Sequence, residues 1–532
     1  MNCRPLFIIL LWALCDFSVR INGANILGLM PIISPSHHGW NSVLMHRLGE
    51  LGHNVTVLSV DIPKPNEKVP PNVHYIHLEK GYSIYDEGDV KLDINEFIDI
   101  GPFKGIKMFN DAVVTLVDVV CASKGFHTLL NYPDDFKFDL VIHDYTMGPI
   151  LLGFLHKFKY PPAVGVSPFH NPPITLDYMS NHYFPAYVPF HGTTFKTEMT
   201  FWERLENTLL IAYDIGYRRL ILNPKIDTVI RKYFPKDMPY LDDIGRRTAI
   251  ALVNSHPATN YVEPLPPNVI EVGGMQILDP KPLPKDLDEY MNKSTNGAVF
   301  FSFGTNMKSQ DFTEEQVRTI LNAMAELSQY NFMWKFDVKY LKEKIPKNVI
   351  VRSFYPQRDI LAHPNLKAFV THCGGLSSQE AMWRGVPMVG VPLFVDQHRN
   401  LKQSLEAGIA VKLDFSTMTS KDIVEAIKTV IQDPKMRENA KVKSKQYQDR
   451  PMRPLDTAVW WVEYMLRNPN PYHLRSPAHK LNIFQANSLD CLLFILLVVI
   501  LVFYLVVKLL AFVWRLLNTN SNSSKKIKKK LI

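Results

Sequence analysis

The sequence predicts an α/β protein with two parallel-sheet halves, followed by a single membrane-spanning helix. Three observations support this prediction. Residues 25–60 run from an apolar stretch through a helical pattern to a second apolar stretch, and residues 369–397 repeat the arrangement. Apolar runs separated by a helix are typical of parallel strands that are buried on both faces. A third apolar stretch, residues 491–514, is long enough to cross a bilayer.

The first half opens with a predicted strand, residues 25–31, and reaches a second strand at residues 55–60. Apolar residues at helical spacing mark one face of the helix between them, at Trp40, Val43, Leu44, Leu48 and Leu51. His37 and His38 lie in the turn between the first strand and this helix. That turn lies at the carboxyl edge of the sheet, where ligand sites form. Each histidine is therefore either a candidate base or a residue that only begins the helix.

A further buried strand, residues 138–143, is followed by Asp144. This acid is expected at the same sheet edge as His37, where it could fix the tautomer of an imidazole and stabilise its protonated form. An imidazole with an intrinsic pKa of ~6.5 serves as a general base near neutrality. The alternative is that Asp144 only caps the turn after its strand. His143 lies on the opposite strand face and is expected to be structural.

The second half is organised around residues 369–397, in which a strand, a turn at Gly374, a helix and another strand follow one another. The first turn of a helix presents unpaired N–H groups and a positive dipole end, and glycine lets a pyrophosphate approach them. His372 could reach a phosphate oxygen, while Asp396 and Gln397 could hold sugar hydroxyls. The alternative is an ordinary strand–turn–helix unit without a ligand.

This stretch resembles the signature of the UDP-glycosyltransferase family, which has the GT-B fold. The matching positions are Phe369, Val370, Thr371, His372, Gly374, Ser377, Glu380, Pro387, Pro392, Asp396 and Gln397. The resemblance implies two Rossmann-like domains that face each other across a cleft. It also implies inverting transfer of a sugar from a UDP-sugar to a hydroxyl of a small lipophilic acceptor. Leu376 departs from the family, because mammalian members commonly have a donor-binding Asn there.

The resemblance assigns roles to single residues. The family's catalytic His lies sixteen residues before the His of a Gly-His pair, and counting back from His53 gives His37, with His38 as the neighbouring alternative. The family's orienting Asp aligns with Asp144. The donor-binding residues implied are Gly304, Thr305, Trp334, Lys335, Gln357, His372, Gly374, Glu380, Asp396 and Gln397.

Within that donor set, Gly304 and Thr305 are expected near the phosphates. Trp334, Lys335 and Gln357 are expected around the nucleoside. Glu380 is the family's ribose-binding acid, because a carboxylate accepts hydrogen bonds from two hydroxyls.

Composition limits the partners and cofactors. Residues 1–23 carry a net charge of +1 and residues 508–532 carry +7, which together account for the whole formal charge of +8. The body therefore gives no support to nucleic-acid binding. Only Cys121 and Cys373 lie outside the predicted leader and membrane segments, too few for a disulfide framework. No Cys/His cluster has ligand spacing, so neither a metal nor another cofactor is expected.

Both ends of the chain carry targeting signals. Residues 1–23 have the layout of a cleaved secretory signal, with a buried first strand as the alternative. The basic tail after the apolar segment should face the cytosol, which makes the chain a type I membrane protein with its body in the lumen. Lys529 and Lys530 resemble the dilysine signal of endoplasmic reticulum residents, while attraction of the tail to anionic lipid is the alternative.

The expected domains are a signal peptide (1–23), an acceptor-binding domain (24–256), a proline-rich linker (257–290), a UDP-sugar-binding domain (291–470), a juxtamembrane segment (471–488), a transmembrane helix (489–514) and a cytosolic tail (515–532). Residues 81–124 and 172–247 show less regular patterns, and the resemblance implies that they shape the acceptor pocket. Asn54 and Asn292 head glycosylation sequons. Asn292 is the better candidate because Asn54 opens a predicted buried strand.

The last predictions concern the donor sugar and three alternatives to a UDP-glucose-dependent transferase. The opening residues 25–38 and the dilysine end look like insect members of the family, which mostly use UDP-glucose. UDP-glucuronic acid stays open as the donor, although the sequence places no cation for its carboxylate. A non-catalytic luminal carrier of lipophiles with the same fold is a second hypothesis. A UDP-sugar epimerase or phosphorylase is a third, which the membrane segment disfavours. The natural acceptor and the oligomeric state, a homo-oligomer included, stay open.

Overall fold

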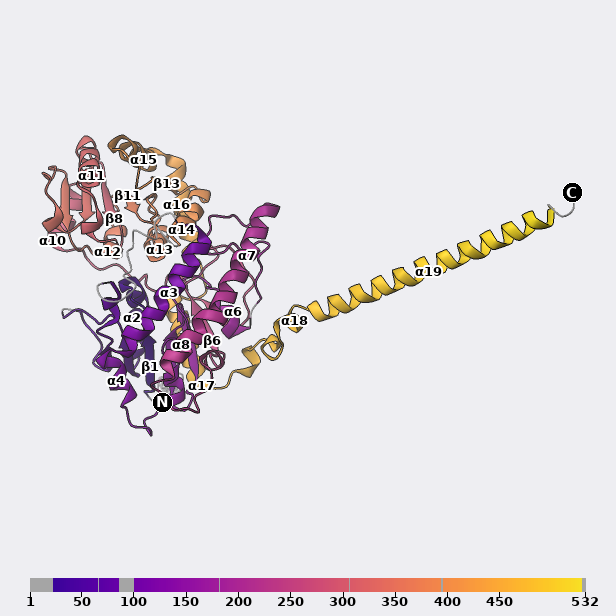
Figure 1. Ribbon diagram of the computed structural model, residues 1–532. Helices are drawn as coiled ribbons and strands as arrows, with labels where there is room; N and C mark the ends of the chain where they lie inside the picture. The colour runs from indigo at the N-terminus through magenta and orange to yellow at the C-terminus, as the bar shows by residue number, and fades with distance from the viewer. Residues whose placement is uncertain are drawn as a thin grey trace, which may run out of the picture. The chain divides into compact units, whose positions relative to one another are not determined.

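A computed structural model of the protein describes residues 23–65, 67–85, 100–180, 182–305, 307–393 and 396–528 (Figure 1). The chain forms two compact units, Met1–Arg475 and Ser476–Ile532. Residues 1–22 of the predicted signal peptide and the dilysine pair, Lys529 and Lys530, lie outside the described residues.

The first half of the larger unit is built on a seven-stranded parallel sheet with the order β3-β2-β1-β4-β5-β6-β7. Its strands are β1 (Asn25–Met30), β2 (Asn54–Ser59), β3 (Val73–His77), β4 (Leu140–Asp144), β5 (Ala163–Ser167), β6 (Ile250–Val253) and β7 (Val269–Glu271). The chain moves outward from β1 to β3 and then returns to place β4 on the other side of β1. Ligands bind at such a reversal of strand order, beyond the carboxyl ends of the strands.

The second half is built on a six-stranded parallel sheet with the order β10-β9-β8-β11-β12-β13. Its strands are β8 (Ala298–Ser302), β9 (Asn331–Lys335), β10 (Val349–Arg352), β11 (Leu366–Thr371), β12 (Met388–Gly390) and β13 (Ala410–Lys412). The order reverses between β8 and β11. The two halves therefore repeat one topology, and the predicted fold class of two Rossmann-like halves is confirmed.

Helices cover both faces of each sheet. In the first half they are α2 (Pro35–Glu50), η1 (Gly81–Tyr85), α3 (Pro102–Cys121), α4 (Lys124–Leu130), α5 (Gly153–Lys157), α6 (Ile174–Met179), α7 (Phe201–Tyr217), the π-helical turn η3 (Arg218–Leu222), α8 (Asn223–Ile230) and α9 (Leu241–Gly245). The long helices α3 and α7 occupy segments for which the sequence predicted less regular structure. That prediction is wrong, because buried apolar residues of α3 recur at helical spacing, as at Val113, Leu116, Val117 and Val120.

The second half adds α10 (Lys285–Asn292), η4 (Ser309–Asp311), α11 (Glu314–Glu326), η5 (Val338–Tyr340), α12 (Gln357–Leu361), α13 (Gly375–Arg384), α14 (Gln397–Glu406), α15 (Ser420–Gln432), α16 (Pro434–Gln448), α17 (Pro454–Arg467) and η6 (Tyr472–Leu474). Although α17 follows the second half in sequence, it packs on α2 of the first half (Figure 1). Its Ala458, Val459 and Val462 share an apolar cluster with Trp40 and Leu44. This helix therefore ties the two halves together.

The smaller unit contains η7 (Pro477–Lys480), α18 (Ile483–Ala486) and α19 (Leu489–Lys528). Within α19, Leu489–Leu517 is a 29-residue apolar span, and the most apolar 18-residue window in it has a mean hydropathy of 3.2. At 1.5 Å per residue this span exceeds the ~30 Å hydrocarbon core of a bilayer. The predicted C-terminal apolar helix is therefore long and apolar enough to cross a membrane.

Candidate active site

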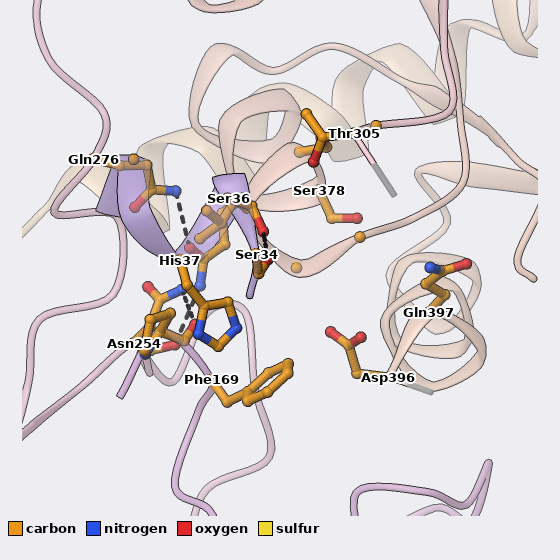
Figure 2. A pocket seen from close by; sticks show the side chains of 18 of the residues that line it. Ser34, Ser36, His37, Phe169, Asn254, Gln276, Thr305, Ser378, Asp396 and Gln397 are labelled. Carbon is orange, nitrogen blue, oxygen red and sulfur yellow. Dashed lines mark hydrogen bonds between the residues drawn. The ribbon is translucent and has the colours of Figure 1, made fainter. Parts of the chain in front are cut away.

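A cavity of about 570 Å³ lies where the carboxyl ends of the two sheets meet. All predicted catalytic and donor-binding residues except Asp144 and Trp334 line it, namely His37, Gly304, Thr305, Lys335, Gln357, His372, Gly374, Glu380, Asp396 and Gln397. Figure 2 shows His37 from the first half and Asp396 from the second half on opposite sides of this cavity. The imidazole and the Gly374 turn thus open onto one shared space.

His37 occupies the first turn of α2, directly beyond the end of β1. The helix begins at Pro35, whose fixed φ suits the first helical position. The ring of His37 packs edge-on against Phe169, with centroids 5.1 Å apart. Its side chain is 10% exposed, so it reaches the cavity while most of the ring is held by the protein. The sequence contained no signal for Phe169, which comes from the loop after β5.

Asp144 ends β4 and lies behind His37, with no exposed side-chain surface. Its Oδ2 is 3.5 Å from Nδ1 of His37 and accepts a hydrogen bond of 3.1 Å from the Asn41 amide. Its Oδ1 accepts one of 3.0 Å from the Thr146 N–H. Burial alone would raise the pKa of this carboxyl, but His37 and Thr146 outweigh burial and hold the pKa below its ordinary value. Asp144 is therefore an ionised carboxylate aimed at an imidazole.

His372 is held between two glycines. A Cβ added at Gly374 would lie 2.4 Å from Nε2 of His372, and one added at Gly304 would lie 2.5 Å from its Cε1. Neither position has room for a larger residue, and Gly304 also adopts a left-handed φ of 77°. Burial and the neighbouring Lys335 lower the pKa of His372 to about 4. Its ring is therefore neutral at physiological pH.

The turn before α13 presents the start of a ten-residue helix to the cavity. Cys373, which precedes it, adopts a left-handed φ of 61° although it is not glycine. Such a conformation is uncommon and is often retained at functional sites. Gly374 is the N-cap, so the first N–H groups of α13 lie at the cavity wall, where a helix dipole favours negative charge.

A hydrogen-bonded pair lies at another part of the cavity. The amide of Gln357 donates to Oε2 of Glu380 over 2.7 Å and to the hydroxyl of Ser377 over 3.1 Å. Burial raises the pKa of Glu380 to about 7, against the opposing effect of Gln357. Lys335 donates to the Gly304 carbonyl over 2.7 Å, and its pKa is lowered by burial and by Lys64.

Asp396 and Gln397 meet at the start of α14. Oδ2 of Asp396 accepts a hydrogen bond of 2.7 Å from Asn400, and burial raises the pKa of Asp396. Oε1 of Gln397 accepts one of 2.8 Å from the Leu393 N–H. Both residues line the cavity opposite His37, so a carboxylate and an amide face the space in front of the imidazole.

Trp334 does not lie at the site, which corrects the prediction. It is fully buried and packs on Phe336, with ring centroids 4.5 Å apart. Adjacent residues of a strand point to opposite faces, so Trp334 enters the core while Lys335 reaches the cavity. Besides Phe169, sequence reasoning missed Phe354, an aromatic side chain that lines the cavity and is 64% exposed. The sequence signal that could have identified it is its position just before Pro356-Gln357, because Gln357 was a predicted donor-binding residue.

The remaining residues that the sequence singled out are His38, His143, Leu376 and the two sequon residues. His38 does not line the cavity, and its ring lies 5.8 Å from that of Tyr75. His143 is buried against the Thr248 hydroxyl at 2.9 Å, as its expected structural role requires. Leu376 lines the cavity, where its apolar side chain offers no hydrogen bond, and it packs against the core of the first half. The sequon residues Asn54 and Asn292 are both exposed.

The residues that the structure describes contain no group of three or more His, Cys, Asp or Glu side chains arranged to hold a metal ion. The groups at the cavity wall that suit a diphosphate are instead the start of α13, the neutral His372 and Lys335.

Comparison with known sequences gives one family and several relatives. The family model described as "UDP-glucoronosyl and UDP-glucosyl transferase" matches residues 108–523. UDP-glycosyltransferase UGT5 of Dactylopius coccus is 35% identical over 518 residues, which cover 95% of this chain and 96% of that protein. UDP-glucosyltransferase 2 of the same organism is 33% identical, over 89% and 90% of the two chains. UDP-glucuronosyltransferase 2B17 of Mus musculus is 30% identical, over 91% and 92%.

Solved structures share the fold at low identity. The calicheamicin glycosyltransferase CalG4 superposes with a TM-score of 0.54 at 15% identity, covering 85% of this chain and all of that chain. The spinosyn forosaminyltransferase SpnP gives a TM-score of 0.54 at 16% identity, over 84% and 99% of the two chains. These likenesses extend to the fold alone, which is the GT-B arrangement of two Rossmann-type sheets.

Proposed function

The chain belongs to the UDP-glucoronosyl and UDP-glucosyl transferase family, and we propose that it transfers glucose from UDP-glucose to a hydroxyl of a small lipophilic acceptor with inversion of configuration. Glycosyl transfer from a UDP-sugar follows from family membership. The sugar, the acceptor class and the catalytic residues are the proposal. The observation that carries it is the pairing of His37 with Asp144 at the wall of a cavity whose other wall is the Gly374 turn.

His37 acts as the general base. The acceptor hydroxyl gives its proton to Nε2 of His37 as its oxygen attacks the anomeric carbon of the sugar. Nδ1 then faces the Asp144 carboxylate, 3.5 Å away, which fixes the tautomer and stabilises the imidazolium. Hydrogen bonds of this kind are often long in an unliganded enzyme and shorten in the reacting complex.

The departing group is UDP. The bond between the anomeric carbon and the diphosphate oxygen breaks as the new bond forms on the opposite face, so one displacement gives a β-glucoside. Negative charge develops on the diphosphate. The N–H groups at the start of α13 and the neutral ring of His372 stabilise that charge through fixed dipoles. We expect these dipoles to suffice without a metal ion.

The nucleoside occupies the part of the cavity near Gln357 and Glu380. The carboxylate of Glu380 accepts hydrogen bonds from the ribose hydroxyls, and Gln357 orients it over 2.7 Å. The exposed ring of Phe354 offers a face on which the uracil base can stack. Asp396 and Gln397 bind hydroxyls of the sugar. Leu376 contributes no hydrogen bond, so the donor has fewer polar contacts at that position.

Glucose rather than glucuronic acid is supported by the charges around the sugar. Among the described residues that line the cavity, the Lys and Arg side chains are Lys335 and Arg358. Lys335 is bonded to the Gly304 carbonyl and Arg358 to Asp359. The Asp396 carboxylate would repel the carboxylate of glucuronic acid. A neutral hexose fits this arrangement better.

The enzyme is proposed to be a type I protein of the endoplasmic reticulum membrane with its body in the lumen. The apolar span Leu489–Leu517 and the basic tail that follows it support this orientation. Lys529→Ser with Lys530→Ser should move the protein to the cell surface, and surface staining of the intact chain would contradict retention. Sensitivity of the luminal Asn292 to endoglycosidase H, lost in Asn292→Gln, tests the orientation.

A donor-by-acceptor screen tests the activity. Membranes that express the chain are incubated with labelled UDP-glucose or UDP-glucuronic acid and a panel of phenols, and the products are separated and counted. We expect glucosides and no glucuronides. Glucuronides in excess would overturn the choice of sugar. Binding of UDP-glucose without transfer to any acceptor would favour a non-catalytic carrier of lipophiles.

A further inference from the structure

A second cavity of about 430 Å³ is lined mainly by residues of the first half. It adjoins the active-site cavity, and Phe109, Phe169, His170 and Asp396 line both. Apolar side chains from the N-terminal part of α3 and from the loop before α7 form much of its wall, including Ile106 and Phe190. An elongated acceptor with its hydroxyl at His37 can therefore extend past Phe169 into this second cavity.

Polar groups without partners lie in the wall of the second cavity. Asn110 is 1% exposed, and neither its amide nitrogen nor its amide oxygen has a hydrogen-bond partner among the described residues. Nη1 of Arg218, which is 5% exposed, and Nδ1 of His191 also lack partners in that part of the chain. Unpaired buried polar groups are rare because each loses its hydrogen bonds to water. Three such side chains in the wall of one cavity indicate a ligand whose polar groups hydrogen-bond to them.

The Arg218 side chain is held rigidly in this wall. Its Nε donates to both oxygens of Asp214, at 3.2 and 3.1 Å, which leaves Nη1 free. The π-helical turn η3 begins at Arg218 and widens the backbone there, and such single-turn insertions are frequent at functional sites. The Tyr217 hydroxyl donates to Asp111 of α3 over 2.6 Å, next to Asn110. These contacts fix α7 against α3 and hold Arg218 and Asn110 in place.

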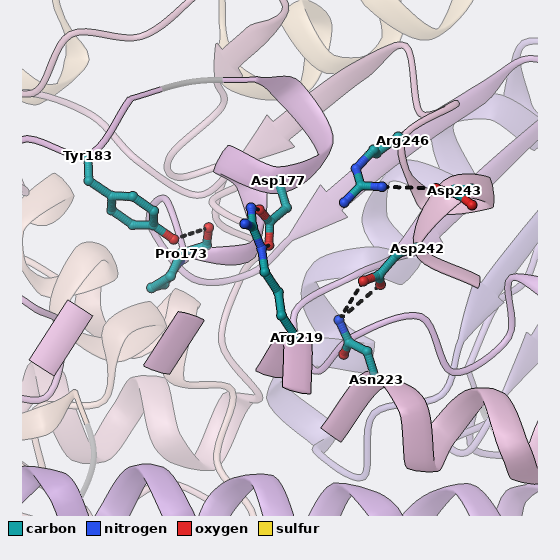
Figure 3. Close-up of polar contacts among 8 residues, drawn as sticks. All are labelled: Pro173, Asp177, Tyr183, Arg219, Asn223, Asp242, Asp243 and Arg246. Carbon is teal, nitrogen blue, oxygen red and sulfur yellow. Dashed lines mark hydrogen bonds and ion pairs between the residues drawn. The ribbon is translucent and has the colours of Figure 1, made fainter. Parts of the chain in front are cut away.

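The adjoining wall around Pro173 is fixed as well. Figure 3 shows the hydroxyl of Tyr183 directed at the Pro173 carbonyl, to which it donates over 2.6 Å. Arg219 pairs with Asp177 in α6, which joins the segment after Pro173 to the π-helical turn (Figure 3). The cavity is thus preformed, as small-molecule sites usually are.

We propose that this second cavity holds the far end of the acceptor and selects molecules whose apolar body ends in a neutral hydrogen-bonding group, such as a hydroxyl or carbonyl. The inference rests on the proposed function, which puts the reacting hydroxyl at His37. Asn110 can both donate to and accept from such a group, and Arg218 can donate to its oxygen.

The charges of the cavity favour a neutral group over a carboxylate. The guanidinium of Arg218 is already paired with the Asp214 carboxylate. Burial lowers the pKa of His191 to about 4, with Arg218 contributing, so its imidazole is uncharged at luminal pH. The Asp396 carboxylate also lies at the junction of the two cavities. An acceptor with an anionic far end would meet no unpaired cation at Arg218 and would be repelled at Asp396.

The test uses two pairs of phenols of different length that differ by one far hydroxyl. Bisphenol A is compared with 4-cumylphenol, and estradiol with 17-deoxyestradiol. In at least one pair the wild-type enzyme should prefer the dihydroxy compound by about tenfold or more in kcat/KM, beyond the statistical factor of two for the symmetric bisphenol. Asn110→Leu should bring that ratio down to the statistical value. Equal rates within both pairs for the wild-type enzyme would overturn the inference.

Equilibrium binding separates this inference from the proposed function. Titration calorimetry with UDP present gives the Kd of each phenol without turnover. A wild-type preference in Kd that Asn110→Leu abolishes supports the far subsite even where no glucoside forms, which would refute only the proposed activity. Glucoside formation with equal Kd values within both pairs would refute only the subsite.

Thermal unfolding supplies a matched control. Asn207, in α7, is buried like Asn110, but its side chain bonds to Phe190 N–H and to the carbonyls of Pro185 and Val188. Asn207→Leu should lower Tm because it leaves these groups unpaired. Asn110→Leu should leave Tm unchanged or raised, because its amide has no partner to lose among the residues that the structure describes. An equal fall in Tm for both variants would show that Asn110 is structural and would overturn the inference.

Discussion

His37 Nδ1 lies 3.5 Å from Asp144 Oδ2, although the two residues follow different strands of the first sheet. They meet because β1 and β4 pair in parallel where the strand order reverses, so both carboxyl ends open at one place. Asn41, one helical turn after His37, donates to the same oxygen of Asp144 over 3.1 Å. The base His37 and the orienting Asn41 thus come from α2, and the acid Asp144 comes from β4.

Asn41→Leu tests the orienting contact. Removing a donor to the ionised carboxylate raises the pKa of Asp144, so the acid limb of the pH profile of kcat/KM should move to higher pH. We expect kcat/KM at neutral pH to fall by about tenfold, as for other groups that orient a catalytic side chain, while the KM for UDP-glucose stays unchanged. Ser42→Ala is the control, because within the described part of the chain the Ser42 side chain hydrogen-bonds only to the Gly39 carbonyl. An unshifted acid limb in Asn41→Leu would remove Asn41 from the mechanism.

The pKa of Glu380, which burial raises to about 7, predicts how donor binding depends on pH. The ionised carboxylate accepts hydrogen bonds from ribose hydroxyls, whereas the protonated form accepts them poorly. Affinity for UDP-glucose should therefore fall as the pH drops through 7, by about tenfold between pH 8 and pH 6 for one such group. Calorimetry with UDP-glucose checks this. Glu380→Gln should bind more weakly at pH 8 and lose the pH dependence, and a dependence that survives in this variant would point to another group.

Gly374→Ala tests the packing of His372 beside the diphosphate site. The added Cβ would lie 2.4 Å from Nε2 of His372, so the imidazole must move away from the turn. The Kd for UDP-glucose should rise by about tenfold or more, because a neutral donor and the approach to the helix start are lost together. Gly216→Ala is the matched control, since its Cβ meets nothing within 4 Å and alanine favours the helix. A Gly374→Ala enzyme with the wild-type Kd would refute a diphosphate site at this turn.

Chelation tests whether fixed dipoles suffice for the diphosphate. After dialysis against EDTA, the rate of transfer should stay within about twofold of the untreated enzyme, because the start of α13, His372 and Lys335 stabilise the negative charge of the diphosphate. Added magnesium or manganese should not raise it. A rate that collapses with EDTA and returns with a divalent ion would show that a metal takes part.

Much of the fold and site could be predicted because both rest on the ends of buried strands. Apolar runs that stop at His372 or at Asp144 locate strand ends, and parallel strands bring those ends to one edge. The GT-B fold, anticipated from the resemblance, is confirmed. The roles of His37 and of the donor-binding residues stay predictions, although the cavity gathers them.

What the sequence did not reveal depends on side-chain direction and on contacts between distant helices. Trp334 and Lys335 could not both face the nucleoside, since adjacent strand residues point to opposite faces. Phe354 gained its importance only from its exposure at the cavity. Asn110 lies on α3 and Arg218 on η3, which continues α7, in segments whose helical spacing was underestimated. Their shared cavity exists only once these helices pack.

The central claim is that His37 removes the acceptor proton in a cavity shared with the donor, and single-turnover transfer tests it most directly. Enzyme in excess over labelled UDP-glucose is mixed with a phenol, and the Kd for UDP-glucose is measured in parallel. We predict that His37→Ala keeps that Kd and slows transfer by about a hundredfold or more, while His38→Ala transfers at the wild-type rate. Near-normal transfer by His37→Ala would contradict the account.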